Sequence, residues 1–285
     1  MGLKLLAHLS DLHLGRSQRN DARADALCRV LVERAVDHVV VTGDITHRGK
    51  RRELERFRRA FAPLLESGRM TVIPGNHDRL GDDVSEELMG PERVSVASLP
   101  GLHLIRLDST GIHNRSFFAS HGIVTEEDVD AVDAALDRAP RGAVVALLLH
   151  HHLLPLPHDN HAERMISWLG WSAAAELATG RELLAVLRGR CDLVLHGHRH
   201  SPGTTTLFSP GSRPLAVYNA GSSTELGHVR VFIHAGGRLT TSPVWMTGPA
   251  LEPRAFHEVV TLDHHQPVLA ALRGVAGGGL SPEAP

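Results

Sequence analysis

The sequence predicts a mixed α/β fold in which strand–helix units come first and antiparallel strands that complete a second sheet come last. Strand-like and helix-like segments alternate over the first two-thirds of the chain. Beyond residue 200 the apolar runs are short and are separated by Gly or Pro turns, with no helix-like segment between them. The chain has 285 residues, 42% of them hydrophobic, which suits one large domain or one domain with an appendage.

Apolar runs and amphipathic spacing place the individual elements. A capping box at residues 125–128 opens one of the expected helices, which ends at residue 136. The other helices are expected over residues 21–35, 52–65 and 181–187. Strands are expected over residues 3–9, 39–42, 71–73, 102–107, 143–149 and 193–195, and then over 215–219, 229–234 and 238–245.

The end of the chain has a different composition. Residues 274–285 are rich in Gly, Pro and Ala, a composition that cannot bury enough apolar surface to fold. We therefore expect a domain over residues 1–250 and a C-terminal extension over residues 251–285 that is disordered from residue 274.

Charge and composition exclude several classes of partner. The formal net charge is −2 at pH 7, so we expect no nucleic-acid partner. The arginine-rich stretch 48–59 contains Glu53 and Glu55 at helical spacing, which favours a solvated helix face. No apolar run reaches the roughly 18 residues that a membrane span needs, so we expect no membrane partner.

The same sequence indicates a cytoplasmic protein. Cys28 and Cys191 form neither a disulfide framework nor a Cys-x-x-Cys pair, so we expect small buried thiols in a reducing compartment. Removal of a signal peptide of about 15–30 residues would also delete Asp11 and His13, which the chemistry below requires.

Metal-capable side chains follow five of the expected strands at the point where each strand ends. In open α/β sheets, ligands bind beyond the carboxyl ends of the strands, so these side chains should meet at one edge. Extended residues i and i+2 also point to the same side. Carboxylate, imidazole and amide donors without a thiolate suit Mn, Fe or Zn and argue against a structural cysteine-type zinc site. The residues are Asp11, His13, Asp44, Asn76, His77, His150, His198 and His200.

Each motif taken alone has a simpler explanation. Residues 75–78, Gly-Asn-His-Asp, are typical of a turn, and residues 196–200 are compatible with an adventitious histidine cluster. The occurrence of all five motifs in order, each after an apolar strand, favours a metal centre. Three consecutive histidines leave one position open: we prefer His150, which directly follows the strand, and His151 is the alternative.

Together the motifs resemble the calcineurin-like metallophosphoesterase superfamily. The chain carries Asp-x-His at residues 11–13, Gly-Asp at 43–44, Gly-Asn-His-Asp at 75–78, a strand-end His-His at 150–151 and Gly-His-x-His at 197–200. The resemblance covers residues 3–245. It implies a sandwich of two mixed β-sheets flanked by helices, with two metal ions at the sheet edges.

The resemblance also implies a division of the ligands. Two divalent cations, Mn, Fe or Zn with Mn favoured, would share Asp44 and sit close enough to clamp a phosphoryl group and activate a bridging hydroxide. His77 would donate a proton to the leaving oxygen, oriented by Asp78 through a hydrogen bond. One ion would be held by Asp11, His13, Asp44 and His200, and the other by Asp44, Asn76, His150 and His198.

Among members of the superfamily, the arrangement is most similar to bacterial class III 3′,5′-cyclic-nucleotide phosphodiesterases. It therefore implies a small-molecule phosphate ester as substrate, with cAMP or cGMP hydrolysed to the 5′-nucleotide. Arg199 is either a contact to the phosphate or the substrate rim, or a surface residue. Residues 152–172, with Met165, Trp168 and Trp171, form either a wall on which a base stacks or an amphipathic packing helix.

Other functions fit the same residues less well. A general phosphodiesterase or phosphomonoesterase of the same superfamily would have identical ligands and is the main alternative. A DNA-repair nuclease would require further DNA-contacting parts, and a hydrolase of lipid-linked nucleotides an exposed amphipathic helix. A non-catalytic metal-binding scaffold is a remote alternative, because every ligand position is filled.

Overall fold

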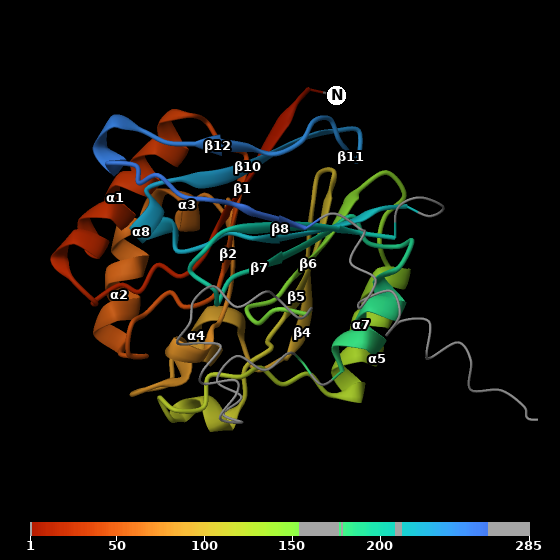
Figure 1. Cartoon of the computed structure of the whole chain (residues 1–285), viewed down its shortest axis with the longest axis horizontal. Coiled ribbons are helices and arrows are strands. Elements are labelled where there is room, and N and C mark those ends of the chain that lie inside the picture. Colours follow the sequence, from red (N-terminus) through yellow and green to blue (C-terminus); the bar gives the residue numbers. More distant parts are fainter. Residues whose placement is uncertain (1, 154–176, 178, 209–212, 262–285) are drawn as a thin grey trace, which may run out of the picture.

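The computed structural model describes residues 2–153, 177, 179–208 and 213–261, and two mixed β-sheets lie at its centre (Figure 1). In the first sheet β1, β2 and β3 are parallel, and β10 is antiparallel to β1. Its order is β11 (Arg238–Leu239), β10 (Val229–Ala235), β1 (Lys4–Leu9), β2 (His38–Thr42) and β3 (Met70–Ile73), with β12 (Val244–Met246) paired to β10.

The second sheet contains seven strands. Four of them, β5, β6, β7 and β9, run parallel, while β4 and β8 pair antiparallel with β5 and β9. Its order is β13 (Val259–Thr261), β8 (Gly203–Leu207), β9 (Leu215–Asn219), β7 (Leu193–His196), β6 (Val144–Leu148), β5 (Leu102–Leu107) and β4 (Val94–Leu99).

Apolar side chains alternate between the two faces of each sheet and form three layers of core. On β1, Leu6 contributes to the cluster between the sheets, where it joins Leu104 of β5, while Ala7 and Leu9 face the helices. Helices α1 (Gln18–Glu33), α2 (Arg51–Ala60) and α3 (Ala62–Glu66) lie beside the first sheet, and α5 (Glu126–Asp137) and α7 (Gly180–Leu187) beside the second (Figure 1). The expected sandwich is therefore confirmed.

Short elements occupy the loops. They are α4 (Ser85–Met89), α8 (Ser223–Leu226) and the 3₁₀ helices η1 (Asn76–Arg79), η2 (Ile112–Arg115) and η3 (Pro249–Leu251). Both cysteines are buried and free. Within the described ranges, no helix has the length and apolarity needed to traverse a bilayer.

Some elements differ from the expectation. Strands β10, β11 and β12 complete the first sheet, through β1, rather than the second, which is extended by β8 and β9. The strand expected over residues 238–245 is divided into β11 and β12, with Pro243 between them. Residue 259 onward adds β13 to the second sheet, within the expected extension. The stacking wall in residues 152–172 falls almost entirely outside the described residues, as does the tail from residue 274.

Candidate metal centre

The carboxyl ends of five strands from both sheets meet at one edge of the sandwich. Asp11 and His13 follow β1, Asp44 follows β2 and Asn76 begins η1 directly after β3. From the second sheet, His150 follows β6, while His198 and His200 follow β7. The structure brings all seven predicted ligands together, and His200, whose side chain is 40% exposed, lies nearest the solvent.

The first predicted ligand set converges through side-chain nitrogen and oxygen atoms. His13 Nε2 lies 3.0 Å from His200 Nε2 and 3.7 Å from Asp44 Oδ2. His200 Nε2 in turn lies 3.8 Å from Asp11 Oδ1. Two imidazole nitrogens at this separation, with a carboxylate oxygen facing each, form a donor set suited to one divalent cation.

The second set converges around Asn76. Its Oδ1 is 3.1 Å from both His150 Nε2 and His198 Nδ1, and His150 Nε2 is 3.5 Å from Asp44 Oδ1. Asp44 thus turns Oδ2 toward the first set and Oδ1 toward the second. A carboxylate with one oxygen on each side is the arrangement that a bridging ligand requires.

Two further observations fit a bound cation. Asp11 Oδ1 is buried and has no hydrogen-bond partner among the described residues, and such an atom is costly unless a cation or donor faces it. Asp11, His13, Asp44 and His198 also adopt positive φ angles of 51°, 46°, 50° and 71°. L-residues rarely adopt this strained conformation, which concentrates at functional sites. The residues therefore fit a pair of divalent metal ions.

The two buried carboxylates of the centre differ in how readily they ionise. Burial raises the pKa of Asp11. Burial would also raise that of Asp44, but His150 and His77 hold the pKa of Asp44 well below its usual value. Burial lowers the pKa of His13 and of His198 far below the ordinary value, which keeps both imidazoles neutral and able to bind metal.

His150 behaves differently. Burial opposes its charge, yet Asp44 raises the pKa of His150 to about 9. A proton on His150 therefore occupies the position beside Asp44 that a cation would take, and metal binding must release it.

The comparisons with known proteins agree with this geometry. The model of the calcineurin-like phosphoesterase family matches residues 5–202. The chain belongs to this family. It is therefore a metal-dependent phosphoesterase, as the motifs predicted.

Individual calcineurin-like relatives show how far the similarity extends. The chain is 27% identical over 277 residues to the 3′,5′-cyclic adenosine monophosphate phosphodiesterase CpdA of Pseudomonas aeruginosa, covering 83% of this chain and 88% of the relative. A dimetal phosphatase from Danio rerio superposes with a TM-score of 0.57 at 14% identity, covering 86% of this chain and 98% of the other. Purple acid phosphatase PPD1 from yellow lupin gives a TM-score of 0.64 at 10% identity over 100% of this chain and 57% of that protein. The two structures establish the shared fold.

The geometry favours His150 over His151 as the ligand of this calcineurin-like site. Both ring nitrogens of His151 are already used, because Nδ1 lies 2.9 Å from Ser109 Oγ and Nε2 donates to the Ser120 carbonyl at 3.0 Å. His150 donates from Nδ1 to the Thr42 carbonyl at 2.8 Å, which turns Nε2 toward Asn76 Oδ1, itself a predicted ligand atom.

A pair of variants tests this assignment. We expect His150→Gln to bind about half of the manganese that the wild-type protein retains, because one of the two ions loses an imidazole ligand, with affinity for that ion falling by at least about 100-fold. His151→Gln should retain the wild-type stoichiometry. Metal analysis after equilibrium dialysis measures both, and a larger loss in His151→Gln would reverse the assignment.

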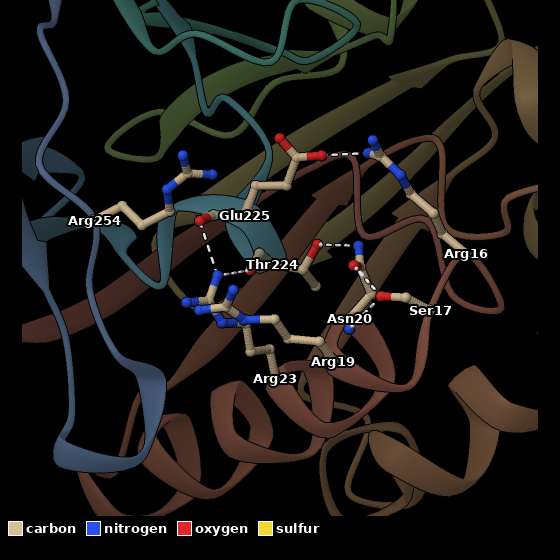
Figure 2. A pocket seen from close by; sticks show the side chains of 8 residues that line it. All are labelled: Arg16, Ser17, Arg19, Asn20, Arg23, Thr224, Glu225 and Arg254. Atoms are coloured by element: carbon tan, nitrogen blue, oxygen red, sulfur yellow. Dashed lines mark hydrogen bonds and ion pairs between the residues drawn. The ribbon is translucent and has the colours of Figure 1, made fainter.

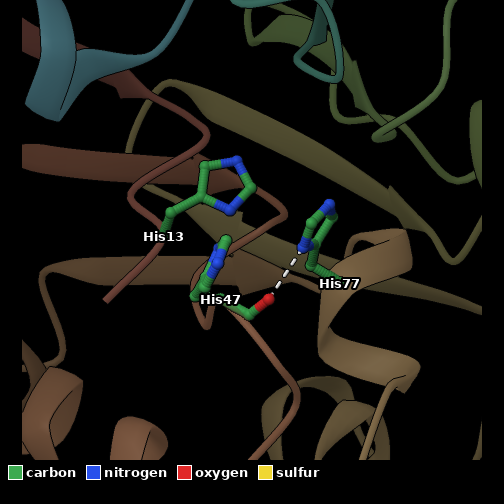
Figure 3. A group of neighbouring side chains, drawn as sticks. All are labelled: His13, His47 and His77. Atoms are coloured by element: carbon green, nitrogen blue, oxygen red, sulfur yellow. Dashed lines mark hydrogen bonds between the residues drawn. The ribbon is translucent and has the colours of Figure 1, made fainter. Parts of the chain in front are cut away.

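His77 lies at the open side of the centre, with its side chain 19% exposed. Its Nδ1 donates to the His47 carbonyl at 2.8 Å (Figure 3). Its Nε2 lies 4.0 Å from Asp44 Oδ2. The prediction that a hydrogen bond to Asp78 orients His77 is wrong. The Asp78 carboxylate is fully buried and accepts hydrogen bonds from the backbone of Ile45, Thr46 and Gly75, so it fixes the loops rather than His77.

Sequence reasoning missed His47. Its ring stacks on His77 at 5.7 Å with an interplanar angle of 24°, and it forms with His13 and His77 a group close enough to share an ion. The available signal was its position three residues after Asp44.

Glu225 of α8 was also missed. Its Oε2 lies 3.8 Å from His200 Nδ1, and Arg16 pairs with its other oxygen (Figure 2). The contact with His200 lowers the pKa of Glu225 to about 2, and despite burial it raises the pKa of His200. A carboxylate behind a metal-binding imidazole orients the ring and increases its basicity. Glu225 also lines a cavity of about 340 Å³, together with Arg19, Arg23 and Arg254.

Arg199 is 9% exposed, and its contact with substrate stays a prediction.

Proposed function

We propose that this calcineurin-like phosphoesterase hydrolyses 3′,5′-cyclic nucleotides, cAMP or cGMP, to 5′-nucleotides. The proposal rests mainly on the similarity to the P. aeruginosa cAMP phosphodiesterase, which spans 83% of this chain. Manganese is the favoured metal, the cytoplasm the proposed location and residues 1–250 the proposed catalytic domain.

The proposed reaction uses the donor sets already described. When bound, two divalent ions supply a clamp on the phosphoryl group and lower the pKa of a water between them. Attack by this water at phosphorus, opposite the 3′ oxygen, would form the new P–O bond, break the P–O3′ bond and leave a 5′-phosphate. The chain must then supply one proton to the 3′ oxygen.

His77 is suited to that transfer. The His47 carbonyl can only accept a hydrogen bond, so it keeps a proton on Nδ1 and leaves Nε2 as the atom that gains or loses one. Nε2 points toward the Asp44 side of the centre, where the phosphoryl group would be held. The protonated imidazole is the form that acts as a general acid.

A substrate panel tests the proposal. The protein is stripped with a chelator, reloaded with Mn²⁺ and incubated with cAMP, cGMP, 2′,3′-cAMP, bis(4-nitrophenyl) phosphate and 4-nitrophenyl phosphate. We expect the highest kcat/KM for a 3′,5′-cyclic nucleotide, with the 5′-nucleotide as the product by chromatography, and no turnover by the stripped protein.

The other outcomes identify the alternatives. Hydrolysis of the aryl diester without turnover of any cyclic nucleotide would establish a general phosphodiesterase instead. Preference for the aryl monoester would establish a phosphomonoesterase. Absence of both turnover and bound manganese would indicate a non-catalytic scaffold.

A further inference from the structure

The loop between β5 and α5 exposes apolar side chains beside the metal centre. In this aromatic loop, residues 111–123, the exposed fraction is 67% for Phe117 and 94% for Phe118, and Ile112 and Ile123 are also exposed. Aromatic residues make up only 4% of the chain, so two adjacent exposed phenylalanines are conspicuous. Exposed apolar clusters of this kind mark binding surfaces.

The aromatic loop is braced from within. Asn114 is 1% exposed, and its Oδ1 accepts from the Gly111 amide at 2.8 Å while its Nδ2 donates to the Ala119 carbonyl at 2.6 Å. The rings of His113 and His121 stack with centroids 4.1 Å apart. Because these polar side chains face inward, Phe117 and Phe118 are presented outward on a preorganised loop.

The same loop is anchored to the reaction centre. Its 3₁₀ helix η2 contacts η1, which carries Asn76 and His77. The Phe117 and His77 rings meet in a T-shaped arrangement, with centroids 5.7 Å apart and an interplanar angle of 77°. On the other side, the Ser120 carbonyl accepts from His151, the neighbour of the predicted ligand His150.

This placement limits what the Phe117 face can bind. The neighbouring imidazole is the proposed donor to the leaving oxygen, so the part of a substrate that extends past His77 is the part attached to that oxygen. In a 3′,5′-cyclic nucleotide this part is the nucleoside, whose planar base can stack on an aromatic face. The Phe117 side chain is 67% exposed, so much of it is open to solvent beside His77 and available to a base.

We propose that Phe117 is a specificity-determining residue whose ring stacks with the base of a nucleotide bound at the metal centre. The inference rests on the proposed function for the choice of a nucleotide. It goes beyond it in naming the residue that distinguishes a nucleotide from a phosphate ester without a base.

The test measures binding directly, so it does not depend on turnover. Protein loaded with Mn²⁺ is titrated by calorimetry with 5′-AMP and with ribose 5-phosphate, which has the same phosphate and sugar but no base. We expect wild-type protein to bind 5′-AMP at least about 10-fold more tightly, since stacking of one base on an aromatic ring commonly contributes that much. In Phe117→Ala the ratio of the two Kd values should fall to near 1.

Matched variants control for indirect effects. Phe118→Ala removes an equally apolar ring from the same loop, and among the described residues it is Phe117, not Phe118, whose ring contacts His77, so the ratio should stay at the wild-type value. Phe117→Trp keeps an aromatic face and should preserve the ratio. The Kd of ribose 5-phosphate should change little in any variant, which verifies that the metal centre is intact.

The outcomes separate this inference from the proposed function. An unchanged Kd ratio in Phe117→Ala overturns the stacking role, whatever the enzyme hydrolyses. A ratio near 1 in the wild-type protein overturns it as well. If the ratio is high and depends on Phe117 while cAMP and cGMP are not hydrolysed, the base-binding role stands and the cyclic-nucleotide proposal fails.

Discussion

Replacing Asp44 with Asn is expected to lower kcat/KM by more than about 10³-fold and to reduce the binding of both metal ions. Asp44 is the residue whose two oxygens face different ligand sets, at 3.7 Å from His13 Nε2 and 3.5 Å from His150 Nε2. An amide has no negative charge and only one acceptor oxygen, so it cannot serve both ions.

The loss should also be visible without any substrate. A ligand that binds only the folded protein raises the free energy of unfolding, by about 2.7 kcal/mol per site at 100 times its Kd. Manganese should therefore raise the Tm of the wild-type protein, and this increase should nearly disappear in Asp44→Asn. Differential scanning calorimetry with and without Mn²⁺ measures it.

Asp128→Asn is the matched control. Asp128 is another buried carboxylate, but it pairs with Arg93 at the start of α5 rather than with a predicted ligand. We expect a lower Tm in that variant and a normal response to manganese. Retention of two manganese ions by Asp44→Asn would contradict the bridging role.

The sequence allowed the ligand set to be predicted because its signals are local. Each predicted ligand follows an apolar strand within five residues, and parallel strands deliver their carboxyl ends to one edge. Thus Asp44 after β2 and His150 after β6 could be placed without knowing how the sheets pack. The alternation of side chains along each strand, which builds the sandwich core, is equally local.

Contacts between distant segments could not be predicted in this way. Glu225 reaches His200 only because α8 follows β9 back to the same edge, and no spacing in the sequence indicates that return. Phe117 lies in a loop with no regular periodicity. Strand β8 was missed because it is a partly exposed strand of Gly and Thr that lacks an apolar run. Asp78 was misassigned because adjacency to His77 does not reveal which way a side chain turns.

Replacing His77 with Gln is expected to have the second largest effect, and that effect should depend on the leaving group. For a 3′,5′-cyclic nucleotide, whose alkoxide leaving group needs a proton, kcat should fall by about 10²- to 10⁴-fold. For bis(4-nitrophenyl) phosphate, whose phenolate leaves without one, the loss should stay below about 10-fold. Steady-state kinetics with both esters, together with metal analysis of the same samples, measures the difference.

His47→Ala is the matched control, because it removes the ring stacked on His77 but keeps the backbone carbonyl that holds Nδ1. A loss below about 10-fold on both esters is expected, since the general acid remains oriented. Equal losses on both esters in His77→Gln would mean that His77 binds the phosphoryl group instead. Loss of manganese from His77→Gln would mean that His77 is a metal ligand. The geometry allows this, because His77 Nε2 lies 4.0 Å from Asp44 Oδ2 and the side chain is grouped with His13 and His47. Only a leaving-group-dependent loss with full metal content supports proton donation by His77.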